Sequence, residues 1–406
     1  MKIPLAASGL RAVDIQSAIE VLNSGNLTMG QMVREFELQM SKYLKVKHFI
    51  MMNSGSSANL AIIEALLRPA NSKPKLKSGD GVLVPAIAWP TTIWPLIQLG
   101  LKPFFVDVAE NTLAIDLQKA QRSVDEHNGQ IKALFPIHPL GYGIEANLLS
   151  DFCLKNEIIL INDVCESLGS WRNGQHAGTN GIAGSFSFYF SHHITTMEGG
   201  GVATNDPIFA DDLRSIRSHG WVRDRIDSNY WKNNDLNNDA KFLFVSSGFN
   251  IRPMEIQAAI GISQIKDIDE FIEKRIRIAQ RVKSAIRGTN LKLIGSENLT
   301  LPKGNQGHSW MLLPIQITSN NAKESRLTVI SELETNGIET RPALTGNFLT
   351  QPAIKNLKFT NQEPKEFTSA TKIAETTFLV SAHHDLSEDQ IEYLCEKLKL
   401  VAIELK

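Results

Sequence analysis

The sequence predicts an α/β protein in which a mainly parallel sheet is followed by a smaller α+β region. Over the first two thirds of the chain, short apolar segments rich in Val, Ile and Phe alternate with segments of helical pattern. After about residue 265 this alternation stops. We therefore expect an N-terminal arm and a large domain at 1–265, with a mixed, mostly parallel sheet between helices, and a small C-terminal α+β domain at 266–406.

The predicted elements follow from these segments. Apolar segments of strand length lie at 81–88, 102–108, 131–138 and 157–164. Helix-like segments between them include 56–68 and 145–157. In the small domain, the sequence predicts a long charged helix at 267–287, a strand at 309–317, a helix at 322–337 and a last helix from Ser387. A polar segment at 223–241 is predicted to be an excursion loop.

Composition narrows the class of protein. The 406 residues carry a formal net charge of -1 at pH 7, so no overall basic field would attract nucleic acid or an anionic membrane. The N-terminus lacks the pattern of a signal peptide, and no apolar segment reaches the roughly 18 residues that span a bilayer. We expect a cytoplasmic protein without nucleic-acid or membrane partners.

The cysteines predict neither disulfides nor a metal site. Cys153, Cys165 and Cys395 are an odd number and lack the C-x-x-C spacing of zinc ligands. Buried free thiols are the expected state, and we expect no bound metal.

Three segments place polar residues where ligands bind to a parallel sheet, outside the carboxyl ends of its strands. Small residues and hydroxyls at 53–59 precede a predicted helix, which suits a phosphate cradle or an ordinary helix cap. Asp163 ends an apolar segment and could cap a helix or hold a protonated ring nitrogen. Ser187 ends another such segment, and His192, five residues later, could be structural or reactive.

Together the three segments indicate one kind of site. A phosphate cradle, a carboxylate for a ring nitrogen and a reactive side chain soon after a serine are the ordered parts of a pyridoxal phosphate site. Further motifs run along nearly the whole chain: "LTMGQMVREFELQMSKYL", "NSGSSANL", "VPAIAWPTT", "INDVCES" and "GFNIRPMEIQAAIGISQI". In these motifs the sequence resembles the DegT-type sugar aminotransferases. That resemblance implies the fold of aspartate aminotransferase, which is fold type I of the pyridoxal phosphate enzymes.

The resemblance implies cofactor-binding roles. The residues that would hold the phosphate are Gly55, Ser56, Ser57 and Ser187, with Asn250 of the neighbouring subunit of a homodimer. Trp89 would stack on the pyridine ring; without the surrounding motifs, a core aromatic would be the simpler interpretation. Asp163 would keep the ring nitrogen protonated. Glu166, where the aminotransferases often have Gln, would hydrogen-bond to the cofactor hydroxyl.

A lysine that binds the cofactor is missing. The aminotransferases of the family have a lysine where this sequence has His192, and no lysine lies between Lys155 and Lys232. Because an imidazole cannot form the covalent imine that lysine forms, we expect a noncovalently held cofactor with pyridoxamine phosphate as its resting form. His192 would serve as a general acid and base, whereas His193 could simply pack beside it.

A histidine at this position resembles the 3-dehydratase branch of the family. The resemblance implies removal of the C3 hydroxyl from a nucleotide-linked 4-keto-6-deoxyhexose, most plausibly GDP-4-keto-6-deoxy-D-mannose, with release of ammonia. Some members regenerate the cofactor through an iron–sulfur cluster, which needs four protein ligands, usually thiolates. Since this chain has three cysteines, we expect no cluster and infer L-glutamate as the amino donor.

Substrate-binding residues also follow from the resemblance. His219, Arg223 and Arg252 would enter the site of the partner subunit, because a diphosphate and a carboxylate both favour arginine donors. Each arginine could instead form a surface ion pair. Asn347 and Phe348, in the matching segment "RPALTGNFL", would contact the substrate.

Two alternatives remain open at this stage. The same chemistry could act on a CDP-, TDP- or UDP-linked 4-keto sugar. The chain could also be a non-catalytic regulator that binds the cofactor or an effector, for which the missing lysine is the only support.

Overall fold

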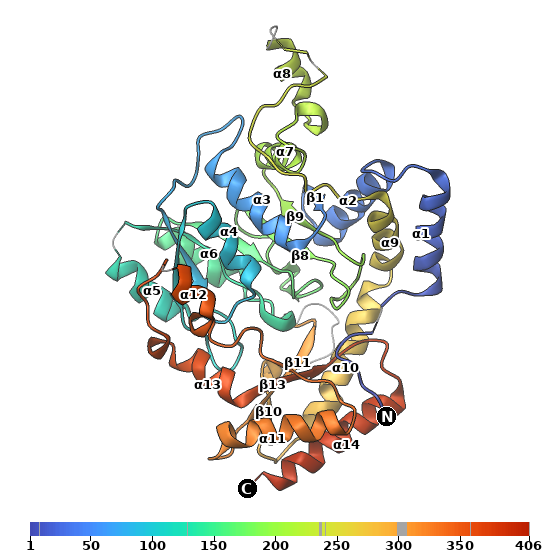
Figure 1. Ribbon diagram of the computed structural model, residues 1–406, viewed down its shortest axis with the longest axis vertical. Helices are drawn as coiled ribbons and strands as arrows, with labels where there is room; N and C mark the ends of the chain where they lie inside the picture. The colour runs from blue at the N-terminus through green and yellow to red at the C-terminus, as the bar shows by residue number, and fades with distance from the viewer. Residues whose placement is uncertain are drawn as a thin grey trace.

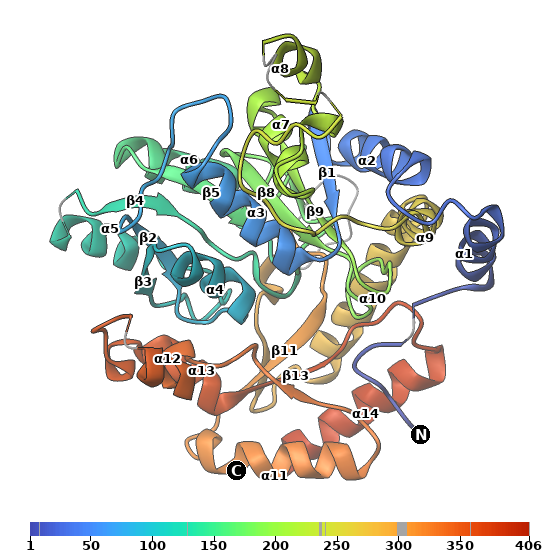
Figure 2. The same cartoon turned by 45° about the horizontal axis from the view of Figure 1, so that its top comes forward.

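The computed structural model of the chain describes residues 1–7, 9–127, 129–234, 238–239, 241–298, 307–357 and 359–405. Figures 1 and 2 show a layer of helices and strands from the first two thirds of the chain, above a smaller layer formed by the C-terminal part. Among the described residues, no helix is long and apolar enough to cross a bilayer.

A seven-stranded sheet lies at the centre of the larger layer, in the order β1-β9-β8-β5-β4-β2-β3. Its strands are β1 (His48–Met52), β2 (Gly81–Pro85), β3 (Lys102–Val106), β4 (Ile131–Leu134), β5 (Ile159–Asp163), β8 (Ala183–Ser187) and β9 (Gly200–Thr204). Strands β3, β2, β4, β5 and β8 pair in parallel, and β9 is antiparallel to β8 and β1. The expected mixed, mostly parallel sheet is confirmed.

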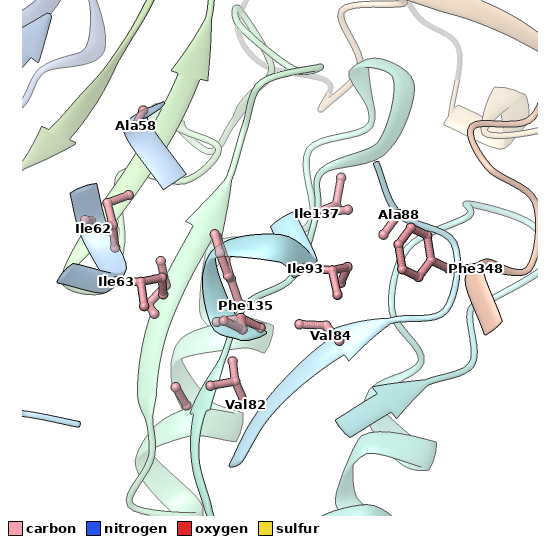
Figure 3. Packing of buried hydrophobic residues seen from close by; sticks show 14 of the residues in the cluster. Ala58, Ile62, Ile63, Val82, Val84, Ala88, Ile93, Phe135, Ile137 and Phe348 are labelled. Carbon is pink, nitrogen blue, oxygen red and sulfur yellow. The ribbon is translucent and has the colours of Figure 1, made fainter. Parts of the chain in front are cut away.

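Helices cover both faces of this sheet. The helices on one face are α3 (Gly55–Leu67), α4 (Pro90–Gln98) and α7 (Pro207–Ile216); those on the other are α5 (Leu117–Glu126) and α6 (Ala146–Lys155). The alternation of side chains along β2 shows the two faces, because Val82 and Val84 join the core beneath α3 and α4 whereas Leu83 joins that of α5 and α6. Figure 3 shows the first of these cores, with Ile62 of α3 and Ile93 of α4.

A third group of helices flanks the β1 edge and leads to the smaller layer. It comprises α1 (Ala12–Ser24), α2 (Gln31–Leu44), α9 (Glu255–Ile265) and the long α10 (Ile268–Ala285). Helix α9 packs against both α1 and α2. Helix α10 extends downward past the smaller sheet, as Figure 1 shows.

The smaller layer is a four-stranded antiparallel sheet covered by helices. Its strands, in spatial order, are β10 (Leu291–Leu293), β11 (Leu312–Ile317), β13 (Thr377–Ser381) and β12 (Arg341–Pro342). Its helices are α11 (Ala322–Thr335), α12 (Pro352–Leu357), α13 (Thr368–Thr376) and α14 (Glu388–Glu404). A two-stranded hairpin, β6 (Trp171–Arg172) and β7 (Gln175–His176), completes the strands of the described residues.

The predicted domain boundary at residue 265 lies where α9 ends and α10 begins. One buried cluster nevertheless contains Met51 of β1 together with Leu398 of α14, so apolar packing is continuous across that boundary. The division of the chain at 265 stays a prediction.

The polar segment at 223–241 is only partly a loop. Its described part contains the helix α8 (Ser228–Asn234), which projects from the molecule at the top of Figure 1, and residues 235–237 and 240 lie outside the described residues. At the base of this projection the rings of Trp221 and Phe242 are stacked, with centroids 5.7 Å apart.

Candidate active site

A cavity of about 600 Å³ lies where the sheet, the start of α3 and strand β12 meet. Its wall includes Gly55 and Ser56 from α3, Asp163 from the end of β5, Ser187 from the end of β8 and Arg341 from β12. The carboxyl ends of parallel strands lie at one edge of a sheet, so this is the position at which the pattern of the sequence predicts a ligand.

The first turn of α3 forms one wall of the cavity. Ser54 caps the helix by accepting a 3.1 Å hydrogen bond from the Ser57 N–H and donating a 3.0 Å one to the Ser57 hydroxyl. The preceding N–H groups, of Gly55 and Ser56, have no acceptor among the described residues. Free N–H groups at the positive end of a helix dipole attract an anion such as a phosphate.

Gly55 allows a close approach at this wall. A Cβ at this position would lie 2.6 Å from the Cβ of Ser187 and 2.9 Å from the Sγ of Cys165. The glycine thus lets α3 approach the end of β8 and keeps the Ser187 hydroxyl beside the free N–H groups. This arrangement fits the cradle that the sequence predicts from Gly55, Ser56 and Ser187.

Asp163 is a buried carboxylate with only neutral hydrogen-bond partners among the described residues. Its Oδ2 accepts 2.8 Å hydrogen bonds from Asn59 and from the Thr92 hydroxyl, and its Oδ1 accepts one of 3.1 Å from the Cys165 N–H. The side chain is 3% exposed and faces the cavity. A buried anion is stable when a cation pairs with it, so this site suits a protonated ring nitrogen.

Glu166 adds a second buried carboxyl group to the wall. Its Oε2 accepts a 2.8 Å hydrogen bond from the Leu140 N–H. Burial raises the pKa of Glu166 to about 7, and the charge of Asp163 adds to the rise, although the Leu140 bond and Arg341 oppose it. Near neutral pH the carboxyl group can therefore donate or accept a hydrogen bond, as a contact with a ligand hydroxyl requires.

His192 lies on the wall of the cavity with its Nδ1 buried and without a hydrogen-bond partner among the described residues. Burial lowers the pKa of His192 to about 3, and the charges of Arg275 and Arg341 act in the same direction. The imidazole is consequently neutral at physiological pH, which is the form that accepts a proton.

His193 points away from the cavity. It is fully buried, and its Nε2–H donates a 3.2 Å hydrogen bond to the carbonyl of Ser309. These contacts suit a structural role for His193 beside His192, and that role stays a prediction.

Trp89 lies at the mouth of the cavity. Its side chain is 46% exposed, so it is not the core aromatic that was the alternative interpretation. The guanidinium of Arg341 lies 5.8 Å from the centroid of the indole ring. The residue is therefore free to stack on a planar ligand.

Ser57, a predicted phosphate ligand, bonds to Ser54 and does not line the cavity. Four predicted residues of other segments also lie outside this cavity within one chain: His219, Arg223, Asn250 and Arg252. His219 and Asn250 are exposed, and the Nε of Arg252 donates a 3.1 Å hydrogen bond to Asn250. Among the described residues, Arg223 pairs with the adjacent Asp224 and lies 4.2 Å from the centroid of the Trp221 ring. These residues are available to a second subunit, and their role there stays a prediction.

Asn347 and Phe348, which were predicted to contact the substrate, do not line the cavity within one chain, and their role toward a substrate stays a prediction. Asn347 is 2% exposed and its amide donates to Pro364 O and to the Thr371 hydroxyl, each at 3.0 Å. Phe348 is 1% exposed and packs against Phe105 in the core shown in Figure 3. Both side chains have internal partners, so neither lines the cavity.

Sequence reasoning missed Arg341, the one arginine or lysine among the described residues of the cavity wall. Arg341 begins the segment "RPALTGNFL", of which only Asn347 and Phe348 were predicted to contact the substrate. The acidic side chains of the same wall are those of Asp163, Glu166, Glu198 and Glu339. Within one chain the cavity is therefore rich in acidic groups.

The fold and the site together define a protein of the aminotransferase fold whose cavity suits a phosphate and a protonated ring nitrogen and carries His192 on its wall. The chain belongs to the DegT/DnrJ/EryC1/StrS aminotransferase family, whose model matches residues 10–399. The expected family and fold type I architecture are thus confirmed.

Several relatives of this chain are named 3-dehydratases. The chain is 36% identical to GDP-4-keto-6-deoxy-D-mannose 3-dehydratase of Yersinia pseudotuberculosis, over 98% of both chains. It is 34% identical to the protein of the same name from Escherichia coli O55:H7, over 98% of this chain and 99% of that one. A solved structure of GDP-4-keto-6-deoxymannose-3-dehydratase with a trapped PLP-glutamate geminal diamine matches with a TM-score of 0.84 and 33% identity, covering 98% and 100% of the two chains.

Proposed function

We propose that this protein is a pyridoxamine phosphate-dependent 3-dehydratase of a GDP-linked 4-keto-6-deoxyhexose, most plausibly GDP-4-keto-6-deoxy-D-mannose, with L-glutamate as amino donor. One observation carries the proposal: the neutral, partly unpartnered imidazole of His192 lies on a cavity whose other residues suit the cofactor. The relatives named 3-dehydratases, similar over almost the whole chain, support the substrate class.

The residues present fit the cofactor at three points. The free N–H groups at the start of α3, with Ser187, would bind the phosphate. Asp163 would hold the ring nitrogen protonated, and Glu166 would hydrogen-bond to the ring hydroxyl. When bound, pyridoxamine phosphate supplies the amine that condenses with the C4 ketone and the ring that accepts electrons.

His192 would move the proton in the dehydration step. Its neutral imidazole would accept a proton from the cofactor carbon that bears the amine. The imidazolium so formed would then donate a proton to the leaving C3 hydroxyl, which would depart as water. The same side chain thereby acts as base and then as acid.

Charge supports a site shared between two subunits. A diphosphate and a glutamate carboxylate favour several cationic donors, but Arg341 is the one arginine or lysine that the described residues bring to the wall. Arg223, Arg252 and His219 lie exposed or half-exposed elsewhere on the chain, and in a homodimer they would enter the partner's cavity. We propose a cytoplasmic location, because the three cysteines are unpaired, as in a reducing compartment.

The test is a reaction with purified protein, pyridoxal phosphate, L-glutamate and GDP-4-keto-6-deoxy-D-mannose. We expect release of ammonia and a 3-deoxy product, without any added reductase. Recovery of an intact 4-amino sugar would instead identify an aminotransferase, the activity suggested by the name of the 26% identical GDP-perosamine synthase of Vibrio cholerae.

A second candidate differs in the nucleotide. The chain is 28% identical to the dTDP-4-dehydro-2,6-dideoxy-D-glucose 3-dehydratase of Saccharopolyspora spinosa, over 96% of this chain and 83% of that protein. A panel of GDP, CDP, TDP and UDP 4-keto sugars, compared by kcat/KM, distinguishes the two candidates. If none is turned over although the cofactor binds, the chain is a non-catalytic homologue.

A further inference from the structure

Arg275 joins three parts of the fold at the back of the active-site cavity. It lies in α10, its side chain is fully buried, and its guanidinium donates to main-chain carbonyls of two other segments. Nη2 donates a 3.1 Å hydrogen bond to the carbonyl of His192, and Nη1 donates to those of Met311 at 3.0 Å and Trp310 at 3.3 Å. Met311 itself lines the cavity.

The guanidinium has no carboxylate within ion-pair distance among the described residues. Burial lowers the pKa of Arg275 to about 10, with Asp385 as the opposing charge, so the group stays protonated at neutral pH. Burying a cation without an ion-pair partner is costly, and folds keep such groups where they have a specific task. Nε is also buried without a partner, so stability alone does not account for the arrangement.

The charge of Arg275 acts on a histidine surrounded by other titratable groups. Groups that line the cavity with His192 or follow it in the chain are Asp163, Cys165, Glu166, Tyr189, His193, Glu198, Glu339 and Arg341. The carboxylates among them favour the imidazolium, whereas Arg275 and Arg341 disfavour it. Arg275 differs from Arg341 in that it is also bonded to the histidine's main chain.

We propose that Arg275 is a positioning residue for His192: it fixes the main chain of the histidine through the carbonyl and opposes protonation of the imidazole by its charge. The proposal rests on the proposed function of His192 as the proton carrier. Arg275 also connects α10, which leads to the smaller layer, to the loop of the larger layer that bears His192. One side chain therefore contacts parts of both layers.

A double-mutant cycle with Arg275→Gln and His192→Asn tests this coupling. Gln keeps amide donors but removes the charge, and we expect kcat to fall on the order of 10- to 100-fold while KM for the sugar nucleotide changes little. In the His192→Asn background, Arg275→Gln should cause almost no further loss, because its effect passes through the histidine. Losses that multiply, or a full kcat in Arg275→Gln, would overturn the proposal.

Arg326→Gln is the matched control. Arg326 also lacks an ion-pair partner among the described residues and donates a 2.8 Å hydrogen bond to a main-chain carbonyl, that of Thr377, but in the small sheet away from the cavity. We expect it to keep wild-type kcat. If Arg275→Gln does not fold, Arg275→Lys takes its place; it retains the charge with a single nitrogen for three carbonyls and should lose part of kcat.

A readout without turnover separates this proposal from the proposed function. In protein labelled with ¹⁵N-histidine and bound to cofactor, the ring-nitrogen signals of His192 are assigned by their loss in His192→Asn. We expect Arg275→Gln to shift these signals and to raise the protonation midpoint on the order of one pH unit, whereas Arg326→Gln leaves them in place. Unchanged signals would refute the positioning role. An enzyme that never dehydrates any sugar would refute the proposed function alone.

Discussion

The side-chain amide of Asn59 donates a 2.8 Å hydrogen bond to Oδ2 of Asp163 in the wall of the cavity. Asn59 is fully buried and comes from α3, the helix whose first turn would provide the phosphate cradle. One helix would therefore position both the proposed anion-binding end of the site and the carboxylate proposed for the ring nitrogen. The distance between these two groups is fixed by the rigid helix.

Asp163→Asn should weaken the cofactor site without unfolding the protein. Asn can still accept the bonds from Asn59 and Thr92, but it removes the negative charge. We expect cofactor affinity to fall by about 2–3 kcal/mol, the value of a hydrogen bond to a charged group. Fluorescence titration with pyridoxamine phosphate measures it.

The control for this variant is Asp107→Asn. Asp107 is also buried, but it pairs with Lys119 at 2.7 Å and accepts hydrogen bonds from the N–H groups of Ser369 and Ala370. Its loss should lower the free energy of unfolding and leave cofactor affinity unchanged. Equal affinities for wild type and Asp163→Asn would contradict the assigned role.

His192→Asn should retain the cofactor and lose the reaction. Without the imidazole we expect dehydration to slow by on the order of 10² to 10⁴ in kcat, the usual contribution of general acid–base catalysis. His193→Asn, by contrast, removes a buried hydrogen bond to Ser309 and should mainly reduce stability. Ammonia release and thermal unfolding distinguish the two variants, and a faster His192→Lys variant would disprove the base role.

The pKa of Glu166 predicts that stability falls with rising pH. Because the pKa in the folded protein is about 7, above its ordinary value of 4.5, the folded state binds the proton more tightly than the unfolded chain. That contribution is complete below about pH 4.5 and is lost as pH rises through 7. The cofactor-free Glu166→Gln variant should be more stable than wild type at pH 8, by at most about 3 kcal/mol, and similar at pH 5. Urea unfolding at both pH values measures this, and equal curves at pH 8 would contradict it.

Mixing two inactive variants tests the shared site. His192→Asn damages the cavity of its own chain, whereas Arg252→Ala would damage the cavity of the partner subunit. Among the described residues, the Arg252 side chain hydrogen-bonds only to Asn250, so its removal should not affect folding. After unfolding and joint refolding of equal amounts, random pairing gives heterodimers in which one site is intact, so we expect about a quarter of wild-type activity. No recovery, with normal dimers present, would place Arg252 outside the partner's site.

Gly55→Ala tests the cradle. Its Cβ would lie 2.6 Å from that of Ser187, so the first turn of α3 must move away from β8. We expect weaker binding of inorganic phosphate and of the cofactor. Gly288→Ala is the comparison: it meets no atom within 4 Å, and with a φ of 74° it should cost only backbone strain of about 1 kcal/mol. Tight cofactor binding by Gly55→Ala would exclude this wall as the phosphate site.

The central strands could be predicted because strands that are buried on both faces of a sheet consist of uninterrupted apolar residues. The segments at 81–88, 102–108, 131–138 and 157–164 each contain a strand of the sheet, and the helix expected from Ser387 starts at Glu388 with Ser387 as its cap. Strand β9 was missed because its glycines have weak strand propensity. These glycines serve close packing, since a Cβ at Gly200 would lie 2.3 Å from the Gly55 nitrogen.

The position of a site residue could be predicted where its motif lies at the carboxyl end of a parallel strand. Asp163 and Ser187 end parallel strands, so their side chains had to meet at one edge of the sheet. Asn347 and Phe348 lie on a 3₁₀ turn, where neighbouring residues point in different directions and the pattern does not reveal which one faces inward. Arg275 belongs to an amphipathic helix that is distant in sequence, and no local pattern relates it to His192.

The described wall of the cavity offers no lysine amine, so a bound cofactor would be retained by noncovalent contacts alone. The time for which the cofactor stays bound would then depend on hydrogen bonds and ionic contacts with the wall. A variant that appears inactive in dilute solution could simply be empty, and activity should recover at high cofactor concentration. In the cell, output from such an enzyme would follow the supply of vitamin B6.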